Sequence, residues 1–135
     1  MPKPTILCVD SDVNALTRRE ALLKSGCNVL ITTSGRQSLE LLAAVPVDAV
    51  ILAPEIPGMN RGIIASRMKQ LKPQVPILLV CPYGLLPDDP PDWVDGFLSD
   101  SEPPDRLAAA VRAMAVGNPS FFDQWWGDWK RRVAA

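Results

Sequence analysis

The chain has 135 residues, 47% of them hydrophobic and 21% charged, with a formal net charge of -1. These values predict a globular domain with a buried core, and the near-neutral charge argues against a nucleic-acid-binding surface. The sequence contains no histidine, which removes the commonest general base and metal ligand and so argues against many classes of enzyme.

The three cysteines indicate a reducing compartment. Cys8, Cys27 and Cys81 are odd in number, widely separated, and placed in or beside apolar segments, which is typical of buried thiols rather than of a disulfide framework. The first apolar segment is only about five residues long, too short for a signal peptide or a membrane span. We therefore expect a cytoplasmic protein.

The first half of the chain alternates short apolar segments with longer amphipathic ones, the pattern of a parallel sheet covered by helices on both faces. The predicted strands cover residues 5–9, 28–32 and 49–53. A helix is predicted over 13–24, and Ser25-Gly26 ends it. Ser34 and Gln37 form a capping-box pattern at the start of a second helix, which Pro46 ends.

The second half continues the pattern with one interruption. A third helix is predicted over 60–70, with four inward side chains: Ile63, Ile64, Met68 and Leu71. Strands are predicted over 76–80 and 96–99, and a last helix over 105–116. Where a fourth helix should lie, four prolines leave room for one or two turns at most: Pro82, Pro87, Pro90 and Pro91. Five strands with right-handed crossovers predict a doubly wound α/β fold.

With these segments in this order, the sequence resembles the response-regulator receiver domains of two-component signalling. The resemblance covers roughly residues 5–116 and rests on segments 6–12 (ILCVDSD), 48–52 (DAVIL), 56–60 (IPGMN), 76–80 (PILLV) and 96–98 (GFL). It implies a five-stranded parallel sheet of order 2-1-3-4-5, as in flavodoxin-like folds. It also implies a site at the carboxyl ends of strands 1, 3 and 4.

Receiver chemistry needs an acidic pair that binds magnesium, a phospho-accepting aspartate, a hydroxyl that hydrogen-bonds the phosphoryl group and a lysine that neutralises its charge. The resemblance matches these roles to Asp10 and Ser11 (with Asp12 displaced by one), Ala53, Cys81 and Asp100. Only the first acid is retained, while Phe97 fills the aromatic position of the fifth strand. An alanine methyl group cannot form an acyl phosphate, and the remaining carboxylates are too few for a magnesium site. The resemblance therefore implies a non-enzymatic domain without metal or cofactor.

Other roles for the acidic residues are less favoured. Asp10, Asp12 and Asp100 could form a vestigial cation site, but Asp12 is better explained as a helix cap and Asp10 as an acceptor of backbone hydrogen bonds. If the three carboxylates gather, Arg61 or Arg36 is a candidate counter-ion. Glu55 could substitute for the phospho-acceptor, although its loop position favours an ordinary surface carboxylate.

Cys81 has two interpretations. It could be a redox-sensitive thiol at a polar edge of the sheet. The sequence places no cation beside it, however, and free cysteines usually behave as small buried hydrophobic residues. The second interpretation is preferred.

The C-terminal segment, residues 118–135, is predicted as a separate amphipathic helix following a domain over 1–117. Asn118 and Pro119 suit its cap and first turn. Its aromatic residues fall on one side: Phe121, Phe122, Trp125, Trp126 and Trp129. Because each ring brings about 150 to 250 Å² of surface, this side must be covered. It either docks on its own domain or binds a second copy or another protein; a membrane surface or DNA is less favoured.

These observations predict a pseudo-receiver that signals by protein–protein interaction without phosphorylation. The expected interface comprises the face from the fourth strand to the fifth helix, including Phe97, together with the aromatic segment, and it binds a partner protein or a second copy. The alternative is a sensor of a small ligand or cation that uses the residual acidic pocket.

Overall fold

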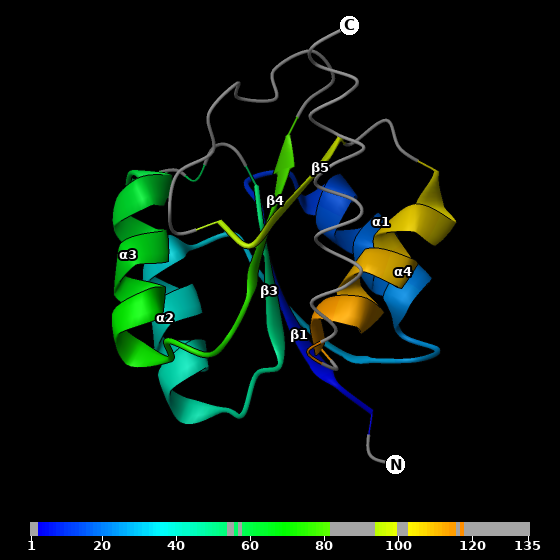
Figure 1. Ribbon diagram of the computed structural model, residues 1–135. Helices are drawn as coiled ribbons and strands as arrows, with labels where there is room; N and C mark the ends of the chain where they lie inside the picture. Colours follow the sequence, from blue (N-terminus) through cyan, green and yellow to red (C-terminus); the bar gives the residue numbers. More distant parts are fainter. Residues whose placement is uncertain are drawn as a thin grey trace, which may run out of the picture.

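The computed structural model describes residues 3–53, 56, 58–81, 94–99, 103–115 and 117. Strands and helices alternate along most of this part of the chain (Figure 1). The strands are β1 (Thr5–Val9), β2 (Asn28–Thr32), β3 (Ala49–Leu52), β4 (Ile77–Cys81) and β5 (Gly96–Ser99). The helices are α1 (Val13–Leu23), α2 (Gly35–Ala44), α3 (Arg61–Leu71) and α4 (Pro104–Ala115).

The five strands form one parallel sheet in the order β2-β1-β3-β4-β5. Figure 1 shows α2 and α3 on one face of this sheet and α1 and α4 on the other. The predicted doubly wound fold and strand order are therefore confirmed. Because all strands are parallel, their carboxyl ends lie at the same edge, where folds of this kind place their sites.

The core lies on both faces of the central strands. Every residue of β3 and β4 is buried, and so are Ile6 to Val9 of β1. This explains why those segments read as continuous apolar runs rather than as alternating patterns. The edge strand β2 is more exposed, with Thr32 its one buried residue.

Polar side chains cap the first three helices. The Asp12 carboxylate accepts hydrogen bonds from the backbone N–H groups of Asn14 and Ala15 at 2.9 and 3.3 Å, as expected for an N-cap. Ser34 caps α2 by accepting from the Gln37 N–H at 3.1 Å. The second half of the expected capping box differs, because the Gln37 side chain accepts from the Thr32 hydroxyl group instead.

The inward face of α3 differs from the prediction. Ile64, Ala65 and Met68 are buried, whereas Ile63 and Leu71 are 50% and 46% exposed. Residues 64, 65 and 68 share one side of a helix at 3.6 residues per turn, and this side excludes position 63. Leu71 falls on the same side as Ile64, but it is the last residue of α3 and is exposed at the end of the helix. The prediction that Ile63 and Leu71 point inward is wrong.

Two predicted elements lie outside the described residues: the shortened fourth helix in the proline-rich region and the C-terminal aromatic helix. In the part of the chain that the structure does describe, no helix combines the length and the hydropathy needed to cross a membrane.

Candidate functional site

The carboxyl edge of the sheet brings together several residues matched to receiver chemistry. Asp10 follows β1 and Ala53 follows β3; the two strands are neighbours, with Val9 opposite Leu52. The Ala53 N–H donates to the Val9 carbonyl at 2.9 Å, which extends this pairing by one residue. Cys81 ends β4 opposite Ser99 of β5. Asp100 and Glu55 lie outside the described residues.

The carboxylate of Asp10 is held on both sides. One oxygen accepts a hydrogen bond from the Asp12 N–H at 2.9 Å, which is the backbone role expected for it. The other lies 2.6 Å from the Arg19 guanidinium. The side chains of Asp10 and Arg19 are only 10% and 11% exposed, so this ion pair is largely removed from water, and removing one partner costs more than it does in a surface pair.

Arg19 is the counter-ion that the sequence did not single out. Of the two arginines considered from sequence, Arg36 forms an exposed pair with Glu40 at 3.7 Å, and Arg61 begins α3. Helical spacing contained a signal for Arg19, because it lies four residues after the buried Ala15 and three after the buried Leu16. A charged residue on the buried side of a helix is unusual, and it indicates that the charge has a partner inside the protein.

The other described receiver positions in the sheet are buried. Ala53 and Cys81 are each 1% exposed, and Phe97 is fully buried. The ring of Phe97 therefore belongs to the core in this structure rather than to an exposed contact surface. Ser11 is exposed, and Asp12, also exposed, is engaged at the start of α1.

The described residues at this edge do not suit the magnesium ion that receiver chemistry employs. Magnesium requires several oxygen ligands in near-octahedral geometry, and Asp10 already has one oxygen on Arg19 and the other on a backbone N–H. The described residues contain no group of three or more side chains suited to binding a metal ion.

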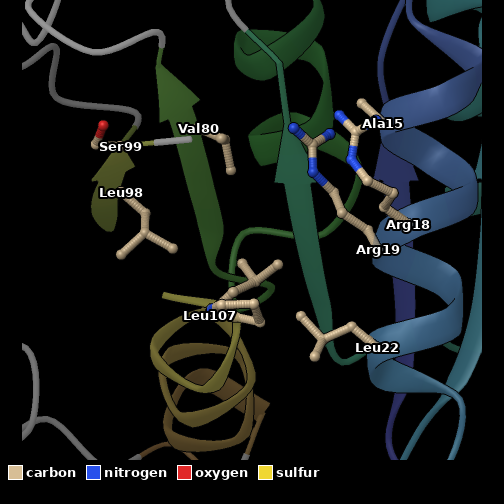
Figure 2. A pocket seen from close by; sticks show the side chains of 9 residues that line it. Ala15, Arg18, Arg19, Leu22, Val80, Leu98, Ser99 and Leu107 are labelled. Carbon is tan, nitrogen blue, oxygen red and sulfur yellow. The ribbon is translucent and has the colours of Figure 1, made fainter. Parts of the chain in front are cut away.

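A pocket of about 310 Å³ opens beside this edge, on the face covered by α1 and α4. Its walls are mainly apolar, and two arginines of α1 join them. The lining residues are Ala15, Arg18, Arg19, Leu22, Val80, Leu98, Ser99, Pro104 and Leu107. Figure 2 shows Leu22 of α1 and Leu107 of α4 extending toward each other across the pocket. Neither the pocket nor Arg18 was predicted from the sequence.

All three cysteines are buried free thiols, as expected. Burial raises the pKa of the Cys8 thiol to about 12, against the lowering effect of Arg19. Burial also raises the pKa of Cys27. Cys81 is as inaccessible as Cys8 by its exposed fraction, 1% against 0%, which supports its interpretation as core rather than as a redox sensor.

The raised pKa of Cys8 predicts an alkaline loss of stability. The folded state keeps the thiol proton up to about pH 12, whereas the unfolded chain releases it near pH 9.0. The contribution of Cys8 is thus complete below pH 9 and declines above it by up to about 1.4 kcal/mol per pH unit. Denaturant unfolding of the protein and of Cys8→Ala at pH 8 and pH 10 should show the steeper decline in the unsubstituted protein. Equal slopes would contradict this.

The sequence and the fold both resemble known proteins. A scan against models of protein families finds no match. The chain is 34% identical over 80 residues to the transcriptional regulatory protein ZraR of Escherichia coli strain K12, a match covering 58% of this chain and 18% of that protein. The chain thus spans less than a fifth of this relative.

Solved receiver domains share the fold over nearly their whole length. The signal receiver domain of an HD domain-containing protein from Pseudomonas fluorescens Pf-5 has a TM-score of 0.72 and 26% identity, covering 88% of this chain and 98% of that one. A CheY-like response regulator receiver domain from Methanospirillum hungatei JF-1 has a TM-score of 0.75 and 17% identity, covering 86% and 96%. Together these likenesses show that the chain has the fold of receiver domains and that its sequence is similar to response regulators of two-component signalling.

Proposed function

We propose that this receiver-domain signalling module works without phosphorylation and without enzymatic activity, by binding a partner protein. The observation that carries the proposal is the Asp10–Arg19 ion pair beside Ala53. Arg19, a side chain of the domain itself, supplies the positive charge at this edge. The residue that follows the neighbouring strand β3 is Ala53, whose side chain is a methyl group.

Physical chemistry supports this proposal in two ways. Phosphoryl transfer by a receiver depends on positioning and on charge neutralisation by a metal ion. Ala53 has no oxygen to attack the donor. A cation at Asp10 would have to displace a guanidinium held at 2.6 Å, leaving that guanidinium partly buried without a partner, which is costly.

The same geometry disfavours the alternative, a cation sensor at the residual acidic pocket. Such a sensor would need Asp10 to release Arg19 and Asp12 to leave the start of α1, where its carboxylate accepts two backbone hydrogen bonds. Both changes would disturb the first helix.

The partner surface that we propose includes the face formed by β4, β5 and α4. Because Phe97 is fully buried, it would support this face from below. The exposed side chains of α4, such as Asp105 and Arg112, would make direct contacts. A polar rim of this kind suits a non-obligate protein interface.

The test of phosphorylation is direct. The full chain is incubated with acetyl phosphate and magnesium, and its intact mass is measured alongside a receiver domain that has a complete site. We expect an adduct on the control domain and none on this chain. An acyl phosphate on any residue of this chain would overturn the proposal.

Partner binding is tested separately. Proteins captured from the native host on immobilised full chain are compared with and without acetyl phosphate and magnesium. The proposal expects one specific partner in unchanged yield. A partner whose yield depends on the phosphodonor would contradict phosphorylation-independent binding.

A further inference from the structure

The pocket between α1 and α4 is an apolar hollow with a positive rim. Leu22, Leu98 and Leu107 are among its apolar walls, and the exposed Arg18 lies at its edge (Figure 2). No described residue forms a salt bridge with Arg18. Such a hollow suits an occupant that combines aromatic or aliphatic groups with a negative charge.

The chain leaves α4 in a way that allows it to return to this pocket. Helix α4 begins at the pocket, because Pro104 and Leu107 line it, and runs away from it to Ala115. Gly117 then has a φ of 69°, and its N–H donates to the Met114 carbonyl at 3.1 Å. A glycine in this left-handed conformation is a common way of ending a helix and changing the direction of the chain.

We propose that residues 118–135 of the same chain fold back along α4 as a helix and cover the pocket with Trp125 and Trp129. The lengths agree. Helix α4 has 12 residues, or about 18 Å of helix. Trp129 lies twelve positions beyond Gly117, so a returning helix brings it level with Pro104 at the start of α4. Trp125 then lies level with Ala108, the residue after Leu107.

The chemistry of the segment matches the hollow. Trp125 and Trp129 are four residues apart and share one side of a helix, where each ring can bury a large apolar area against the leucines. Asp128 flanks the same side and can pair with Arg18, whose guanidinium can also lie over an indole ring. The segment therefore supplies both the aromatic rings and the negative charge that suit this pocket.

The length of the connection favours this contact over one with a second copy. The segment begins at Asn118, directly after the turn at Gly117. So short a connection gives the docked segment an effective concentration of the order of millimolar. A second copy at micromolar concentration cannot compete with it for the pocket. The contact does not depend on how the module signals.

The test measures the accessibility of Trp129 in the full chain. The starting protein has Trp93, Trp125 and Trp126 replaced by phenylalanine, so that the fluorescence comes from Trp129 alone while position 125 keeps an aromatic ring for the pocket. In this background Arg18→Glu repels Asp128 and Leu22→Asp places a charge in the pocket. Arg67→Glu is the matched control, because Arg67 is an exposed arginine of α3 on the opposite face of the sheet. Circular dichroism confirms that each variant is folded.

We expect acrylamide to quench Trp129 weakly in the starting protein and at least twice as strongly in Arg18→Glu and Leu22→Asp, with no change in Arg67→Glu. Light scattering should give the mass of one chain at every concentration. Three results would overturn the proposal: strong quenching in the starting protein, quenching that neither pocket variant changes, or a dimer that dissociates on dilution together with exposure of Trp129.

Discussion

Replacing Arg19 by methionine should lower the free energy of unfolding by on the order of 3 kcal/mol. Methionine keeps much of the aliphatic length of arginine and removes the charge. The carboxylate of Asp10, 10% exposed in its side chain, then keeps, among contacts with the described residues, only the hydrogen bond from the Asp12 N–H. An unpaired charge in such a place has lost much of its hydration without a compensating partner. Denaturant unfolding at neutral pH measures the change.

Two further variants separate the ion pair from the loss of packing. Asp10→Asn in the Arg19→Met background removes the stranded charge, and it should recover at least half of the lost stability. Arg67→Met changes an exposed arginine of α3 and should alter stability by less than about 0.5 kcal/mol. If Arg19→Met is no more harmful than Arg67→Met, the ion pair has no structural role.

The fold could be predicted from the sequence because its signals are local and repeated. Continuous apolar runs such as Ile77–Cys81 indicate strands buried on both faces. The amphipathic segments between them indicate crossovers, and the resemblance to receiver domains supplied the strand order. The inward face of α3 was harder to predict, because Ile63 and Ile64 are adjacent in sequence and the start of the helix decides which of them is buried.

The site could be predicted only in part, because its electrostatics join distant positions. Asp10 and Ala53 were expected at one edge, since residues that follow parallel strands meet there. The partner of Asp10 was not expected. Arg19 is two turns into α1, and its neighbour Arg18, with the same chemistry, is exposed. A difference of one residue in helical phase decides which of the two arginines is internal. The pocket was not expected for a different reason: it combines α1 with strands and a helix from much later in the chain.

Asp10, Arg19 and Ala53 form one corner of the domain, at the carboxyl ends of β1 and β3. Placing further carboxylates in this corner should make the stability of the protein depend on magnesium. In the double variant Ser11→Asp with Ala53→Asp, the buried position after β3 carries a carboxylate next to the strand of Asp10. Arg19 cannot neutralise several carboxylates, so without metal the variant should be less stable than the parent by on the order of 3 kcal/mol. At a magnesium concentration of about 100 times its dissociation constant, binding should return roughly 2.7 kcal/mol.

Thermal and denaturant unfolding with EDTA or with millimolar magnesium measure this directly. The parent protein and Ser11→Asp alone are the controls, and the metal should change the stability of neither. The comparison isolates the role of Arg19: if it acts as the resident cation of this corner, metal becomes useful only when a carboxylate after β3 joins those after β1. Equal stabilisation of the parent by magnesium would mean that Asp10 exchanges Arg19 for metal readily, and the case against a cation site would fail.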